Sequence, residues 1–129
     1  MKSNKKAFTL VEIMVVVLII AILAAIAIPN LLRSRITANE SAAKATLKSI
    51  STALENYYSI NNQYPLTTSP LIGEVPPYLS TDYFVGDHQG YNYTAALNLY
   101  TYSILAVPVS PSTGTASYTI NTQGVLAQN

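Results

Sequence analysis

The sequence predicts an α+β fold in which one long N-terminal helix leads into a small antiparallel β-sheet. Two observations carry this prediction. The residues from about Phe8 to Ile60 include no glycine and a single proline, Pro29. The segment after Gly90 is instead rich in tyrosine, threonine, isoleucine and valine, often in alternation with smaller polar residues, which is typical of strands. With 129 residues, the chain has room for one ordinary domain and an appendage.

The first half of the helix is long and apolar enough to span a membrane. Every side chain in Ile13–Ile28 is apolar, and Glu12 is the only charged residue within residues 7–32. At about 1.5 Å per residue, a helix over residues 8–28 measures roughly 31 Å, which matches a bilayer core. A charge at membrane depth costs roughly 2.5–3.5 kcal/mol on insertion scales, so Glu12 marks a functional site. The alternative is a carboxylate that reaches the lipid headgroups.

The second half of the helix is amphipathic. Apolar residues recur at coiled-coil spacing and predict a buried stripe, while polar and charged residues fill much of the remaining surface. The stripe consists of Ile36, Ala43, Leu47, Ile50, Leu54 and Tyr57. Pro29 lies between the two halves and predicts a kink, because it lacks a backbone N–H and crowds the preceding turn. The alternative for Pro29 is the first turn of a separate helix.

Loop and strand signals follow the helix, which is expected to end between Ile60 and Asn62. Seven prolines and glycines within residues 65–90 predict a loop with a short helical turn around Pro77–Leu79. Pro108 predicts a strand end or an edge position. Three or four antiparallel strands are expected, and the helical stripe can cover their apolar face. Their predicted ranges are residues 91–94, 99–109, 116–120 and 125–126.

Composition and charge narrow the classes of function. All seven Lys and Arg residues lie at or before Lys48, so the distal region is a poor match for nucleic acid. The chain has no cysteine, and Asp82 with Asp87 offers too few oxygen ligands for a calcium site. His88 has no nucleophile placed beside it. The ten tyrosines are interpreted as strand residues that bury their rings and keep their hydroxyls in water. We therefore expect no catalytic residue, cofactor or metal, and no enzyme.

The N-terminus admits two interpretations. Three lysines precede the apolar run, as in a secretory signal with a small-residue cleavage site at Ala25–Ala27. Cleavage at Ala27 would release a soluble protein and discard Glu12. However, the apolar run is longer than the roughly 7–15 residues usual for such a signal, and the helical pattern continues beyond it. We therefore expect the segment to be retained, either in an assembling protein or in a membrane anchor that never polymerises.

The N-terminal residues resemble a known family. Lys5-Lys6-Ala7 followed by Phe8-Thr9-Leu10-Val11-Glu12 and an unbroken apolar run is similar to the type III signal of type IV pilins and type II secretion pseudopilins. The resemblance implies that a prepilin peptidase cleaves between Ala7 and Phe8 on the cytoplasmic face and then methylates the new amine of Phe8. Ala7 stands where most family members have glycine.

The resemblance also provides a partner for Glu12. It implies that Glu12 of one subunit pairs with the terminal amine of another and sets the axial register of a helical homopolymer. Such a pair is directional in apolar surroundings, and removing one partner of a buried pair costs roughly 3–5 kcal/mol. The other implied partners are the prepilin peptidase, the inner membrane, and an inner-membrane assembly platform with its ATPase.

On this basis the chain divides into four parts and carries the pilin fold. The expected parts are a leader (residues 1–7), a transmembrane and filament-core half-helix (8–28), an amphipathic half-helix (29–62) and a globular head (63–129). The resemblance implies a single-pass inner-membrane protein before assembly. After assembly, the subunit would belong to a pilus on the cell surface or to a periplasmic pseudopilus, and the sequence leaves these two open.

Overall fold

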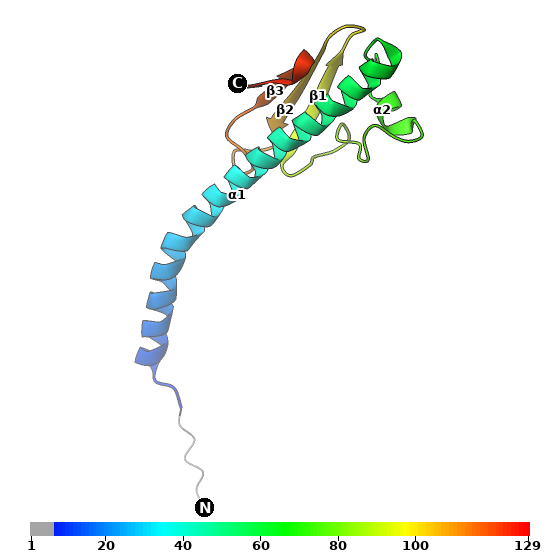
Figure 1. The fold of residues 1–129 in the computed structure, drawn as a ribbon. Helices are drawn as coiled ribbons and strands as arrows, with labels where there is room; N and C mark the ends of the chain where they lie inside the picture. Colours follow the sequence, from blue (N-terminus) through cyan, green and yellow to red (C-terminus); the bar gives the residue numbers. More distant parts are fainter. Residues whose placement is uncertain (1–6) are drawn as a thin grey trace, which may run out of the picture. The chain divides into compact units, whose positions relative to one another are not determined.

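The computed structural model describes residues 7–129 and contains a long helix, a short helix and a four-stranded antiparallel sheet (Figure 1). This confirms the predicted α+β fold. Most of the predicted leader, residues 1–6, lies outside the described residues. The chain divides into a unit that ends at Ser34 and a distal unit of residues 35–129, and each is described by itself.

Helix α1 runs from Leu10 to Asn61 and is continuous through Pro29. A separate helix beginning at Pro29 is therefore wrong, whereas the kink stays a prediction. In the unit that ends at Ser34, nearly all α1 side chains are exposed although most are apolar. Among residues 7–129, α1 is the one helix long and apolar enough to cross a membrane, a test that a secretory signal also passes.

The sheet is a meander in which each strand pairs antiparallel with the next one along the chain. Its strands are β1 (Tyr91–Leu97), β2 (Tyr102–Pro108), β3 (Tyr118–Asn121) and β4 (Val125–Gln128). Pro108 is the last residue of β2, which confirms the predicted strand end. The alternative, an edge strand, is wrong, because β2 lies inside the sheet between β1 and β3.

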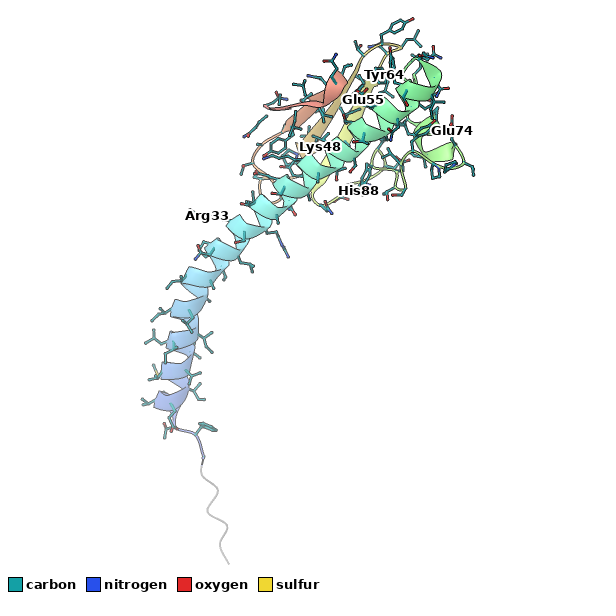
Figure 2. All side chains as sticks on the ribbon, viewed as in Figure 1. Arg33, Lys48, Glu55, Tyr64, Glu74 and His88 are labelled. Atoms are coloured by element: carbon teal, nitrogen blue, oxygen red, sulfur yellow. The ribbon has the colours of Figure 1, made fainter. Side chains whose placement is uncertain are left out.

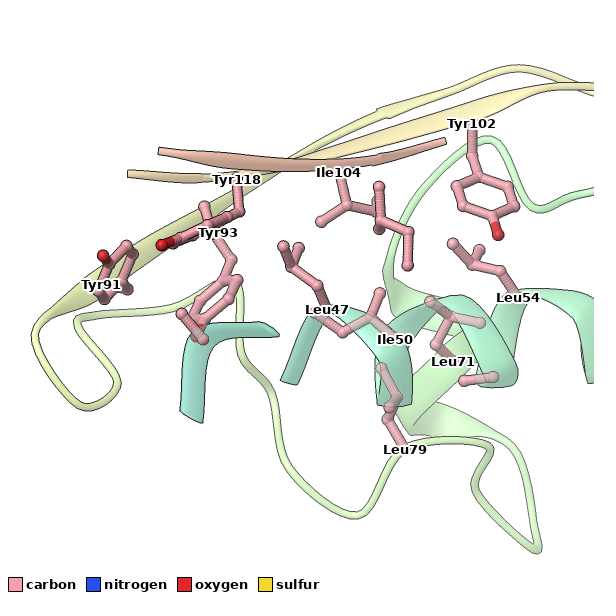
Figure 3. Close-up of a cluster of buried hydrophobic side chains, with 14 of the residues drawn as sticks. Leu47, Ile50, Leu54, Leu71, Leu79, Tyr91, Tyr93, Tyr102, Ile104 and Tyr118 are labelled. Atoms are coloured by element: carbon pink, nitrogen blue, oxygen red, sulfur yellow. The ribbon is translucent and has the colours of Figure 1, made fainter. Parts of the chain in front are cut away.

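The core of the distal unit lies between α1 and one face of the sheet (Figure 3). Four residues of the predicted stripe are fully buried, whereas Ile36 and Tyr57 are half-buried; the buried four are Ala43, Leu47, Ile50 and Leu54. Alternate residues of the sheet face them, as the two-residue period of a strand requires. These are Tyr91, Tyr93, Tyr102, Ile104, Ala106, Tyr118 and Ile120. All four residues of β4 are exposed, so β4 contributes backbone pairing but no buried side chain.

The segment between α1 and the sheet contains helix α2 (Ser69–Gly73). The helical turn predicted around Pro77–Leu79 is wrong. A residue before proline is driven out of the helical region, which disfavours a helix at Pro76-Pro77. Pro70 lies in the first turn of α2, where a missing N–H costs no hydrogen bond. The Leu79 N–H donates to the Leu71 carbonyl (2.8 Å), and both side chains are buried, which ties this loop to α2.

Gly114→Ala is expected to destabilise the distal unit by about 1–3 kcal/mol through overpacking. The Tyr91 ring covers Gly114 so closely that an added Cβ would overlap its atoms. The ring is fully buried, and its hydroxyl donates to the Ala116 carbonyl (2.9 Å), so it has no room to move aside. Urea unfolding followed by circular dichroism measures the loss. Gly73→Ala is the control, because no atom lies within 4 Å of its added Cβ. Equal midpoints for the two variants would contradict this packing.

Candidate functional site at the start of the long helix

Thr9 and Glu12 cap the N-terminus of α1 reciprocally. Glu12 Oε2 accepts hydrogen bonds from the Thr9 backbone N–H (2.7 Å) and from the Thr9 hydroxyl (2.9 Å). The Glu12 N–H in turn donates to Thr9 Oγ1 (3.2 Å). The helix begins at Leu10, so Thr9 is the N-cap and Glu12 the third helical residue, which is the spacing of a capping box. Glu12 therefore has a local structural role in addition to any role in assembly.

Sequence analysis missed this capping pair, although the Thr-x-x-Glu spacing before an apolar run is its known signal. These hydrogen bonds hold the Glu12 carboxylate against Thr9, the residue that follows Phe8. Phe8 itself is 83% exposed, and residues 7–9 precede the helix in non-helical backbone. The second oxygen, Glu12 Oε1, accepts no hydrogen bond from residues 7–129. One carboxylate oxygen thus holds the helix end, and the other is open to a further donor.

The apolar surface beyond Glu12 is exposed on every side of the helix. The large side chains in residues 13–32 are between 46% and 70% exposed, with Leu32 and Leu31 at the two limits. A helix that is apolar all round is covered by lipid or by other protein. Ala7 and Phe8 thus lie directly before the capped start of α1, Glu12 lies in its first turn, and Pro29 lies farther along the same helix.

A second carboxylate, Glu55, lies on α1 (Figure 2) and joins four segments of the distal unit by hydrogen bonds. Glu55 Oε1 accepts hydrogen bonds from the Tyr64 hydroxyl (3.1 Å), the Tyr102 hydroxyl (3.0 Å) and the Gln123 N–H (3.2 Å). The Tyr102 hydroxyl also lies 2.7 Å from Ser51 Oγ. We call Ser51, Glu55, Tyr64, Tyr102 and Gln123 the Glu55 hub. It connects α1, the segment after α1, β2 and the turn before β4.

The hub and the core correct the expectation that the tyrosine hydroxyls stay in water. Tyr64 and Tyr102 donate to Glu55, and Tyr91 donates to a backbone carbonyl. Burial raises the pKa of Tyr64 and Tyr102 above the ordinary value, and the neighbouring Glu55 carboxylate raises both pKa values further. Burial also raises the pKa of Tyr91 to about 12. These hydroxyls are structural donors inside the distal unit.

Hydrogen bonds from α1 hold the loop between β2 and β3. The Asn39 amide donates to the Thr113 carbonyl (2.9 Å). Glu40 Oε1 accepts from the Thr115 N–H (3.1 Å) and from the Thr115 hydroxyl (2.8 Å). Both bonds lower the pKa of the Glu40 carboxylate below its ordinary value of 4.5, and the bond from the Thr115 backbone has the larger effect. The Lys44 ammonium lies 4.7 Å from the centre of the Tyr118 ring, close enough for a cation–π contact.

The polar residues of the loop before β1 stabilise its own backbone. His88 Nε2 lies 3.0 Å from the Asp82 carbonyl oxygen and 3.2 Å from that of Val85. Asp82 Oδ1 accepts a hydrogen bond from the Phe84 N–H (3.0 Å). Within residues 7–129, no three His, Asp or Glu side chains gather as a possible metal-binding group.

Comparisons with known proteins concern the N-terminal motif and about half of the chain. Residues 2–28 match the family described as the prokaryotic N-terminal methylation motif. The chain is 45% identical over 69 residues to the type IV wide pilus major component PilA4 of Thermus thermophilus. It is 44% identical over 61 residues to the type IV major pilin protein PilA of Myxococcus xanthus. It is 37% identical over 70 residues to the type II secretion system core protein G of Aeromonas hydrophila. The chain is therefore similar over its N-terminal half to type IV pilins and to type II secretion core proteins.

The matched segments cover 54%, 47% and 54% of this chain in the Thermus, Myxococcus and Aeromonas comparisons. They cover 53%, 28% and 49% of those relatives, so the chain spans about half of their length or less. The names of the relatives denote structural subunits of pili and of a secretion system. The methylation motif includes Ala7, Phe8 and Glu12, so the capping pair lies inside the matched region.

Proposed function

We propose that this chain is a structural, non-catalytic subunit of a helical type IV pilus-like filament. A prepilin peptidase cleaves it between Ala7 and Phe8 and methylates Phe8, and an assembly platform with its ATPase polymerises it from the inner membrane. One observation carries the proposal: a carboxylate with an open oxygen, Glu12 Oε1, stands at the head of an exposed apolar helix. A long apolar helix stabilises an assembly by burying this surface against other copies of itself.

The capping box supports an intermolecular role for Glu12. Cleavage before Phe8 creates an amine one residue before Thr9, on the side of the helix end toward which the carboxylate is directed. Oε2 is engaged by Thr9, so Oε1 is available for the amine of a neighbouring subunit. A charge-assisted hydrogen bond is about twice as strong as a neutral one and fixes a geometry. The pair would therefore set the axial register between helices whose apolar contacts alone can slide.

The alternative filament is the pseudopilus of a type II secretion system. The similarity to type II secretion core proteins G from several bacteria favours it as directly as the pilin similarities favour a pilus. Deletion of the gene separates the two alternatives. Loss of filaments sheared from the cell surface supports a pilus, whereas loss of exoprotein secretion without loss of surface filaments supports a pseudopilus.

The mass and N-terminal sequence of the mature protein test the processing step. We expect a chain that begins with N-methylated Phe8 in the membrane fraction and in any filament fraction. A chain that begins at Ile28 would identify a secreted protein, and a chain that begins at Met1 would identify an uncleaved anchor. Either result would overturn the proposal. Ala7→Gly is the matched control and is expected to give the same mature chain, because both residues are small.

A further inference from the structure

The turn between β1 and β2 presents two apolar side chains to solvent. It spans residues 98–101 and is closed by a hydrogen bond from the Asn98 N–H to the Thr101 carbonyl (2.9 Å). Its central residues are Leu99 and Tyr100, which are 39% and 70% exposed. Glycine, asparagine, aspartate and proline are favoured in such turns for their backbone conformations, and Leu-Tyr offers none of these advantages. Neither side chain belongs to the core, so the fold does not account for them.

This turn is held in place as a fixed projection. The Tyr64 N–H donates to the Leu99 carbonyl (2.8 Å) and ties the turn to the segment after α1. The Tyr64 hydroxyl is in turn anchored by Glu55. An exposed aromatic side chain on a supported backbone loses little entropy when it binds, which is why tyrosine is enriched at interfaces. We call Leu99 and Tyr100 the knob.

A hollow of about 410 Å³ lies at the other end of β2. It is lined by Pro108, Val109, Ser110, Pro111, Gly114 and Thr115. Two prolines stiffen its wall, and Val109 is 49% exposed. The Asn39–Thr113 and Glu40–Thr115 hydrogen bonds hold this loop on α1. The hollow is therefore formed within a single copy of the chain.

Knob and hollow are too far apart to meet within one molecule. Strand β2 begins at Tyr102, two residues after Tyr100, and ends at Pro108, which lines the hollow. The Tyr102 end of β2 contacts α1 at Glu55, and the β2–β3 loop contacts it at Glu40. Fifteen helical residues separate these two levels, which is about 22 Å along α1. The residues that form the knob and line the hollow are themselves uncharged.

We propose that the knob of one copy docks in the hollow of a second copy that is displaced along α1. The two surfaces are different, so the contact is heterologous and leaves a free knob and a free hollow at the ends of each pair. Such contacts build open-ended assemblies instead of closed dimers. The inference rests on the proposed filament and adds a contact between distal units to the Glu12 contact between N-terminal helices.

Disulfide trapping tests the contact, and the cysteine-free chain is well suited to it. The full-length double variant Tyr100→Cys/Val109→Cys is expressed in cells, and filaments are sheared, oxidised and resolved without reductant. We expect a ladder of covalent multimers from the double variant. Each single variant is expected to give at least tenfold less multimer, because a heterologous contact does not bring two identical positions together. The matched control Tyr100→Cys/Val85→Cys places the second cysteine at a residue that is 71% exposed and outside the hollow.

The outcomes separate this contact from the filament itself. Filaments that form in the double variant without a ladder would overturn the contact and leave the proposed function standing. An equal ladder in the control pair would also overturn it, because the trapping would then be unspecific. Strong dimers from Tyr100→Cys alone would show a symmetric contact and refute the heterologous one. If the unmodified protein forms no filament in the sheared or the membrane fraction, the proposed function fails, and the contact fails with it.

Discussion

Glu12→Ala is expected to abolish filaments while leaving membrane insertion intact. The substitution removes the only charge in the apolar segment, so insertion becomes more favourable, by at most the roughly 2.5–3.5 kcal/mol that a charge costs at the centre of a membrane helix. It also leaves the amine of a neighbouring subunit without its partner in apolar surroundings, at a cost of roughly 3–5 kcal/mol per contact. Because each 1.4 kcal/mol is a factor of ten, every contact weakens by more than about a hundredfold. Membrane-fraction immunoblots and electron microscopy of sheared filaments measure the two effects.

Two further variants separate assembly from helix capping. Glu12→Gln keeps a side chain that can cap the helix at this position but loses the charge, so it should fail to assemble like Glu12→Ala. Thr9→Val removes the capping hydroxyl and keeps the carboxylate. It should cost only about 1 kcal/mol of helix stability and still form filaments. Normal filaments from Glu12→Gln would refute the pairing, and loss of filaments from Thr9→Val would assign the requirement to the cap.

Glu55→Ala is expected to lower the stability of the distal unit by about 3 kcal/mol. The carboxylate accepts hydrogen bonds from two tyrosine hydroxyls and one backbone N–H, and bonds to a charged group contribute about 1.5–3 kcal/mol each. Tyr102 keeps the Ser51 contact, so part of the loss is recovered. The Tyr64 hydroxyl has no hydrogen bond to another hub residue that could replace its bonds to Glu55. Urea unfolding of the full chain in detergent, followed by circular dichroism, measures the change.

The C-terminal segment should respond most to this substitution. Strand β4 buries no side chain, and the Gln123 bond to Glu55 fixes the turn before it on α1. We therefore expect limited proteolysis to cut near residues 122–129 in Glu55→Ala several times faster than in the unmodified chain. Asp87→Ala is the control, since this carboxylate is exposed and lies outside the Glu55 hub. Equal unfolding midpoints for the two variants would show that the hub contributes no stability.

The elements that follow from local spacing were predictable. The apolar run, the stripe and the alternating strand segments each express a period of one regular structure, so their type and approximate bounds could be predicted. The capping box was predictable too, because the Thr9-x-x-Glu12 spacing before an apolar run is local, although the sequence analysis does not include it. The short helix was predicted around Pro77–Leu79 but lies at Ser69–Gly73, where Pro70 occupies the first turn that proline prefers.

The sequence by itself determined the membrane-length helix, its N-terminal methylation motif and the stripe that meets the sheet, because these depend on residues a few positions apart. Only the tertiary structure decided which tyrosines meet Glu55 and which loop forms the hollow. Tyr102 and Gln123 lie 47 and 68 positions from Glu55, and Thr115 lies 75 positions from Glu40. Contacts over such separations depend on how the sheet seats on α1. That is set by the packing of the whole core, which no local pattern in the sequence expresses.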